Sequence, residues 1–320
     1  NADGYKKASD VCKLCASTLN IAEDDVIVAS TGVIGVPLPL EPFEQKLYLM
    51  KKMMSSENGS DCAEAIMTTD TVKKAMEMTI DGKTVTVGGI AKGSGMIHIN
   101  MGTMLSFVTT DCAISSKMLE EALKEAVEDS YNMVSVDGDT STNDTLAIMA
   151  SGKAGNKEIT TKNEDYKTFV AGLTEAFKSL AKQLAKDGEG ATKLLICDVS
   201  GAKTKKDAVG VAKTVIGSSL VKTAMFGADA NWGRVLCAIG YSGMDVDISK
   251  VKVTFKSEGG EVLVCEDGAG VGFDEDEAKK VLSCDTVIIN IELNDGEGFA
   301  EAYGCDLTYD YVKINGDYRT

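Results

Sequence analysis

Short runs of β-branched residues alternate along this chain with segments whose apolar residues recur at helical spacing. The helical spacing is found in residues 8–19, 62–78, 117–131, 167–186 and 208–216, and in shorter segments at 233–241 and 275–282. The β-branched runs are residues 26–30, 83–90, 105–110, 145–150, 193–199, 250–255, 261–265 and 286–293. Because helices and strands do not follow a strict β-α-β order, the pattern predicts a layered α/β or α+β fold in which helices cover sheets.

The composition is that of a globular chain with a substantial core. Of its 320 residues 44% are hydrophobic, and no window approaches the roughly 18 uninterrupted apolar residues of a membrane-spanning helix. The first twenty residues lack a basic start followed by an apolar stretch, and nine scattered cysteines fit a reducing compartment. We therefore expect a cytoplasmic protein without membrane contact, or an organellar one if a targeting segment preceded residue 1.

The charge balance limits the classes of partner. A formal net charge of −16 disfavours nucleic acid, since phosphate binding requires a basic face and only short lysine clusters occur. The acidity either attracts a cationic small molecule or only keeps the chain soluble.

Motifs for metals and nucleotides are incomplete. Cys12 and Cys15 have the C-x-x-C spacing but share one face of an expected helix, where core packing competes with a redox or metal role. The acidic turn that begins at Asp137 resembles a calcium loop, yet its sixth and twelfth positions are Thr142 and Ile148. Neither a complete phosphate loop nor a dinucleotide fingerprint occurs. The sequence thus predicts no cofactor and no metal.

The single histidine narrows the catalytic options. A Ser-His-Asp triad would have to use His98, which we expect to be structural, and no nucleophile-elbow motif is present. A mechanism that needs no histidine is a threonine whose own α-amine, with an ordinary pKa of about 7.7–8.0, serves as base after the preceding peptide bond is cut. Thr103 follows the flexible Gly102 just before an apolar run, although such a pair also fits a purely structural strand start.

The hypothesis of a threonine nucleophile is supported by eight segments that occur in a fixed order. Together they resemble the arginine-biosynthetic glutamate N-acetyltransferase family, also named ornithine acetyltransferase. The resemblance covers the whole chain. The segments are ASTGVIG (29–35), IMTTD (66–70), KGSGMIH (92–98), NMGTML (100–105), STNDT (141–145), DGEGATK (187–193), NWGR (231–234) and the terminus CDLTYDYVKINGDYRT (305–320).

The resemblance implies an enzyme that processes itself. Members of that family cut their precursor before a threonine, and the freed threonine carries an acetyl group from N-acetylornithine to glutamate. Here the cut would fall between Gly102 and Thr103 and divide the chain into residues 1–102 and 103–320, which interleave in one sandwich of sheets and helices of the N-terminal-nucleophile type. Thr103 would be the nucleophile and, through its α-amine, the base. Thr31 and Gly32 match the oxyanion hole.

The resemblance also implies how the substrates bind. Lys92 would pair with a substrate carboxylate and Glu189 with the δ-ammonium of ornithine. The expected partners are N-acetylornithine, glutamate and further copies of the chain in a homo-oligomer, with acetyl-CoA open as a second donor. The positions that match the substrate-binding residues of the family are Thr69, Lys92, Thr103, Glu189, Asn315 and Thr320.

The sequence departs from the family pattern at several positions, and two alternative functions stay open. Ile99 and Gly102 stand where the family usually has proline and alanine, and Ala230 and Gly316 also differ from it. The family's longer N-terminal portion leads us to expect that this chain begins partway into it. One alternative is an N-terminal-threonine amidase or aminopeptidase on a related fold. Another is a binding protein in which Gly102-Thr103 is never cut.

Overall fold

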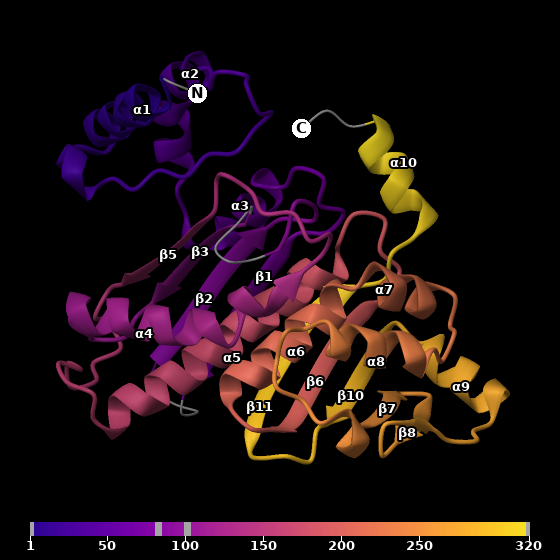
Figure 1. Ribbon diagram of the computed structural model, residues 1–320. Helices are drawn as coiled ribbons and strands as arrows, with labels where there is room; N and C mark the ends of the chain where they lie inside the picture. Colours follow the sequence, from indigo (N-terminus) through magenta and orange to yellow (C-terminus); the bar gives the residue numbers. More distant parts are fainter. Residues whose placement is uncertain (1–2, 81–84, 99–103, 318–320) are drawn as a thin grey trace.

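Two β-sheets and the helices packed on them make up the structure, a computed structural model that describes residues 3–80, 85–98 and 104–317 (Figure 1). The first sheet has the strand order β1-β2-β3-β5. Its strands are β1 (Lys74–Ile80), β2 (Val85–Lys92), β3 (Leu105–Thr110) and β5 (Thr145–Ala150). Antiparallel pairing of β2 with β3 puts Lys92 opposite Leu105. The end of β2 therefore lies beside the start of β3, two residues after the predicted cleavage site.

The second sheet has the order β4-β11-β6-β10-β7-β8-β9. Strand β10 of this sheet alternates buried and half-buried residues, as expected where its apolar side chains face a helix layer. β6 pairs in parallel with β10 and antiparallel with β11. The strands are β4 (Val134–Ser135), β6 (Leu194–Ala202), β7 (Lys252–Ser257), β8 (Gly260–Glu266), β9 (Ala269–Gly270), β10 (Thr286–Glu292) and β11 (Gly298–Cys305).

One long helix joins the two sheets. α5 (Glu164–Lys186) contacts β1 and β2 of the first sheet and β4, β6 and β11 of the second. Its buried residues Phe169, Leu173, Phe177 and Leu180 recur every three or four positions and form a stripe in the common core. α5 ends at residue 186, so the loop that follows it emerges beside the start of β1 and the end of β2 (Figure 1).

The other helices cover the sheets. α4 (Ser116–Glu128) packs on α5, α6 (Lys205–Gly217) on β6 and β11, and α9 (Glu275–Leu282) on β7 and β8. Taken singly, no described helix is long and apolar enough to cross a membrane; α6 and α7 pass that test only as a pair bent by 57°. The remaining helices of this part are α7 (Ser219–Phe226), α8 (Trp232–Gly240) and the short η3 (Tyr131–Met133) and η4 (Ile248–Lys250).

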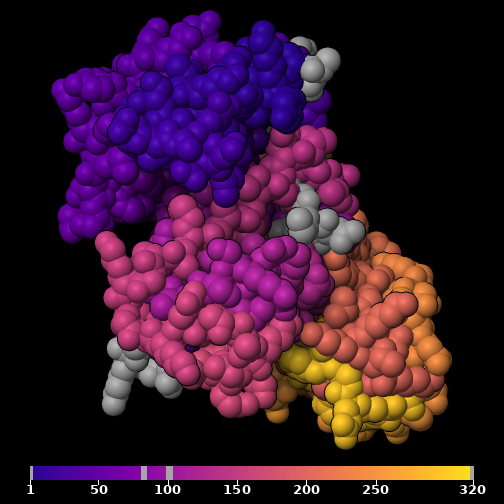
Figure 2. Space-filling view, turned by 90° about the vertical axis from the view of Figure 1, so that its left-hand side faces the viewer, coloured from indigo at the N-terminus to yellow at the C-terminus, as the bar shows by residue number. Residues whose placement is uncertain are grey.

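The N-terminal helices form a separate group at one end of the molecule. α1 (Gly4–Leu19) packs against α2 (Glu41–Met53), and Figure 2 shows these indigo segments set above the magenta ones. α3 (Gly59–Ala65) connects the group to β1 and β2. Two short helices, η1 (Glu23–Asp25) and η2 (Ser56–Asn58), lie in this part, and α10 (Tyr309–Asp317) lies at the opposite end of the chain.

The predicted layered α/β class is confirmed, but two predicted elements are wrong. Residues 62–78 were expected to be one helix, whereas α3 ends at Ala65 and β1 begins at Lys74. The amides of Thr71 and Val72 donate to the side chain of Asp187, so they leave the helical hydrogen-bond ladder. Residues 26–30, expected as a strand, pair with no strand among the described residues. The sequence also did not predict α2, α7, α10, β1 and β11.

Candidate active site

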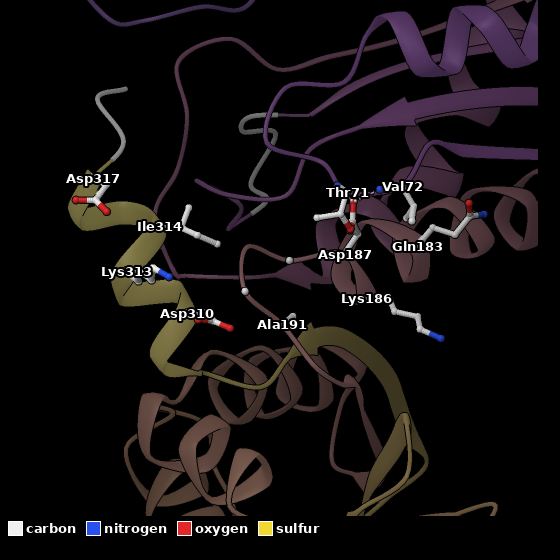
Figure 3. A pocket seen from close by; sticks show the side chains of 12 residues that line it. Thr71, Val72, Gln183, Lys186, Asp187, Ala191, Asp310, Lys313, Ile314 and Asp317 are labelled. Atoms are coloured by element: carbon white, nitrogen blue, oxygen red, sulfur yellow. Dashed lines mark hydrogen bonds between the residues drawn. The ribbon is translucent and has the colours of Figure 1, made fainter.

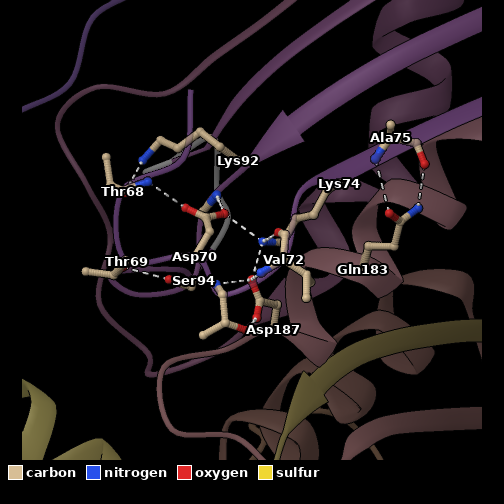
Figure 4. A network of polar contacts seen from close by, with 12 residues as sticks. Thr68, Thr69, Asp70, Val72, Lys74, Ala75, Lys92, Ser94, Gln183 and Asp187 are labelled. Atoms are coloured by element: carbon tan, nitrogen blue, oxygen red, sulfur yellow. Dashed lines mark hydrogen bonds and ion pairs between the residues drawn. The ribbon is translucent and has the colours of Figure 1, made fainter. Parts of the chain in front are cut away.

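A buried ion-pair network lies where β1 begins and α5 ends (Figure 4). The ammonium of Lys74 is 2.6 Å from the carboxylate of Asp70 and 2.6 Å from that of Asp187, and the Lys74 side chain is fully buried. Burial favours the neutral form of Asp70, but the Gly93 amide and Lys74 outweigh it and hold the pKa of Asp70 below its ordinary value. The network therefore fixes the loop before β1 to the loop after α5.

Lys92 extends this arrangement toward β3. Its side chain is buried at the end of β2, and its ammonium donates to the hydroxyl of Thr68 at 3.3 Å. Burial lowers the pKa of Lys92, while the nearby carboxylates of Asp70, Asp144 and Glu189 oppose that shift. These acidic neighbours favour the charged form of Lys92, and an ammonium group can bind a substrate carboxylate.

Glu189 approaches from the loop between α5 and β6. Its amide donates to the carbonyl of Ser94 at 2.8 Å, and its carboxylate accepts a hydrogen bond of 2.8 Å from Asn315 on α10. A Cβ on Gly95 would lie 2.3 Å from the Glu189 carboxyl carbon. Glycine at position 95 is therefore what allows the carboxylate to lie against this backbone.

Thr69 completes the cluster. Its hydroxyl lies 2.7 Å from the hydroxyl of Ser94, next to the residues that hold Lys92 and Glu189 (Figure 4). The structure thus brings together four of the sequence-predicted substrate-binding residues, which come from four separate segments: Thr69, Lys92, Glu189 and Asn315.

The remaining predicted residues are not joined to this cluster. Thr31 is half-buried and Gly32 is exposed, in the loop between η1 and α2, and among the described residues no hydrogen bond links either to the cluster. Gly102, Thr103 and Thr320 lie outside the described residues. Their assignment as cleavage site, nucleophile and substrate ligand stays a prediction.

Sequence reasoning missed the carboxylates and the lysine that support the site. Asp144 accepts a 2.5 Å hydrogen bond from the amide of Met104, the first described residue after the predicted cut. Burial raises the pKa of Asp144 to about 6, against the opposing effects of the Met104 amide and Lys92. Asp144 and Asp187 both lie in segments that resemble family motifs, which was the available signal, whereas Lys74 lies outside all eight.

His98 has a structural environment. Its Nδ1 lies 3.0 Å from the hydroxyl of Ser135, and burial lowers its pKa. The imidazole is thus held neutral beside a β-bridge between residues 98 and 135.

A cavity of about 600 Å³ opens between α10 and the end of α5 (Figure 3). Thr71 and Asp187 line one side of it, and Asp310 and Lys313 of α10 line the other. The cavity adjoins the ion-pair network, but Lys92, Glu189 and Asn315 are not among its lining residues. The converging side chains therefore define the candidate site better than this cavity does. No group of three or more metal-ligating side chains occurs within the described ranges.

Comparison with known proteins points to one family. Residues 1–320 match the model of the ArgJ family. The arginine biosynthesis bifunctional protein ArgJ 1 of Clostridium acetobutylicum is 51% identical over 320 residues, which are 99% of this chain and 78% of that protein. The ArgJ protein of Geobacillus stearothermophilus is 49% identical over 321 residues, 100% of this chain and 77% of that one. The crystal structure of the ArgJ protein of Bacillus halodurans is similar with a TM-score of 0.64 and 47% identity, over 68% of this chain and 100% of that chain.

Proposed function

Because the chain belongs to the ArgJ family and is an ornithine acetyltransferase of arginine biosynthesis, we propose that Thr103 carries its acetyl group. The observation that supports this most is the convergence of Lys92, Glu189 and Asn315 at the end of β2 that faces the start of β3. Thr103 is two residues from Leu105 along the chain. A substrate bound at this end of β2 would therefore face both the cation of Lys92 and the anion of Glu189.

Cleavage between Gly102 and Thr103 is the first stage of this proposal. Attack of the Thr103 hydroxyl on the Gly102 carbonyl gives an ester, and water then releases a chain that ends at residue 102. The length of the Bacillus halodurans chain agrees with this division, since it matches 68% of our chain along its own full length. Residues 103–320 make up the same share of the sequence.

Acetyl transfer is the second stage. The α-amine of Thr103 takes the proton of its hydroxyl, the hydroxyl accepts the acetyl group, and ornithine leaves before glutamate attacks the acetyl ester. In this scheme Glu189 binds the δ-ammonium of N-acetylornithine and Lys92 binds a carboxylate. Thr31 and Gly32 form the oxyanion hole, and Thr69, Asn315 and Thr320 complete the substrate site.

We further propose a cytoplasmic homo-oligomer. An amidase or aminopeptidase is not favoured, since the relatives are biosynthetic proteins.

Mass measurement and an acetyl-transfer assay test the proposal together. We expect purified protein to give two species under denaturing conditions, one of which begins Thr103-Met104-Leu105. We also expect acetyl transfer from N-acetylornithine to glutamate to exceed hydrolysis. A single uncut chain, or hydrolysis without transfer, would overturn the scheme. The same assay with acetyl-CoA as donor tests whether the enzyme uses it.

Replacing Gly95 with alanine is expected to weaken binding of N-acetylornithine selectively. The added Cβ would displace the Glu189 carboxylate, a flexible end that moves away without unfolding the chain. The loss of one charge-assisted contact should raise KM for N-acetylornithine about tenfold to a hundredfold, with a smaller effect for glutamate. Steady-state kinetics with each substrate varied in turn measures this.

Gly88→Ala is the matched control. A Cβ at this position of β2 would meet its nearest atoms at 3.9 Å, so we expect kinetics close to those of the unchanged chain. Equal increases in KM for both substrates in the Gly95 variant would argue against the proposed role of Glu189.

A further inference from the structure

Two carboxylates in this protein hold a threonine and the residue after it in the same way. Asp187 accepts hydrogen bonds from the amides of Thr71 and Val72 on one oxygen, at 3.0 and 3.3 Å, and from the Thr71 hydroxyl on the other. Asp306 accepts hydrogen bonds from the amides of Thr192 and Lys193 on one oxygen, at 2.8 and 3.0 Å. Its other oxygen accepts a hydrogen bond from the Thr192 hydroxyl.

Asp144 shows half of this arrangement. Its Oδ1 accepts the amide of Met104 at 2.5 Å, and the residue before Met104 is Thr103. Its Oδ2 is buried and has no hydrogen-bond partner among the described residues. A buried carboxylate oxygen without a partner is costly, so its occurrence beside a reacting segment calls for an explanation. Lys92, from β2, is the charged group of the described part that acts on Asp144.

We propose that Asp144 is the base of the cleavage step and that its Oδ2 takes the hydroxyl proton of Thr103, the residue that precedes Met104 in the sequence. The proposal rests on the proposed cleavage. The Thr103 hydroxyl gives its proton to Asp144 Oδ2 while its oxygen bonds to the Gly102 carbonyl carbon. The bond from that carbon to the Thr103 nitrogen then breaks, and Asp144 returns the proton to the leaving nitrogen.

A separate base is required because the α-amine is absent before the cut. In the uncut chain the Thr103 nitrogen is a peptide nitrogen, which has no basicity at neutral pH, and the amine becomes available only as the product of this step. A carboxyl group whose pKa is about 6 is well suited to take and return a proton near neutrality.

The test follows cleavage of the full chain during cell-free translation, where the uncut chain is seen at early times. We expect Asp144→Asn to cleave about 100-fold more slowly or worse. For the unchanged chain we expect a rate that rises with pH up to about 6 and then levels, because only ionised Asp144 accepts the proton. Asparagine keeps an acceptor for the Met104 amide, and thermal unfolding checks that the variant folds.

Two controls separate the possible causes. Asp111→Asn changes a carboxylate that accepts the Thr86 amide at 2.7 Å at the other end of the β2-β3 pair, and should cleave normally. Hydroxylamine cuts an ester that has already formed, so it should not restore cleavage to Asp144→Asn. Restoration, wild-type cleavage by this variant, or a flat pH profile for the unchanged chain would overturn the assignment. If the unchanged chain stays uncut at every pH, the proposed cleavage itself fails.

Discussion

Thr103→Ala is expected to remain a single uncut chain and to lose acetyl transfer by at least about a thousandfold. Alanine has no hydroxyl to attack the Gly102 carbonyl, so neither the ester nor the free α-amine forms. The same hydroxyl is the proposed acetyl carrier, so the second stage is lost as well. Intact mass under denaturing conditions measures the first effect, and acetylglutamate formation measures the second.

Thr103→Ser is the matched control for this prediction. Serine keeps both the hydroxyl and, after cleavage, the α-amine, and it loses only the methyl group that restricts χ1. We expect it to cleave and to transfer acetyl groups, at reduced rates. An alanine variant that still transfers acetyl at a measurable fraction of the normal rate would mean that glutamate attacks N-acetylornithine directly, without an acetyl-threonine.

Elements with a strong local pattern could be predicted from the sequence. The helix expected at 275–282 and the strand expected at 105–110 have the observed bounds. Acidic residues start the helix, and three successive β-branched residues end the strand. Residues 62–78 could not be predicted this way, because the turn at Asp70 and Thr71 depends on Asp187, 116 residues from Thr71. Local periodicity contains no information about such a partner.

The residues of the candidate site also differ in whether the sequence alone could predict them. The cluster of Thr69, Lys92, Glu189 and Asn315 was expected from family motifs, and the structure brings these residues together. Lys74 was not expected, because its importance lies in a contact with Asp187 across 113 positions of sequence. An isolated lysine at the start of a strand looks like a surface residue until its two carboxylate neighbours are known.

Lys74→Met is expected to lower the free energy of unfolding by about 3–5 kcal/mol. Methionine fills a similar volume but removes the ammonium between the carboxylates of Asp70 and Asp187, which are 2.6 Å from it and buried. Breaking a buried ion pair on one side leaves charges without compensation, which costs more than the pair contributed. Urea unfolding of the variant and the unchanged chain measures the difference. Lys73→Met is the control, because Lys73 is half-exposed and pairs weakly with Glu64 at 3.8 Å.

The same substitution should also affect catalysis, because Lys74 joins the two segments that carry the proposed substrate-binding residues. Asp70 accepts the Gly93 amide next to Lys92, and Asp187 is two residues before Glu189. Where Lys74→Met remains folded, we expect KM to rise for both substrates, unlike in Gly95→Ala, where the effect falls on N-acetylornithine. A variant that is less stable but has unchanged KM values would show that Lys74 supports the fold alone and leaves the substrate residues in place.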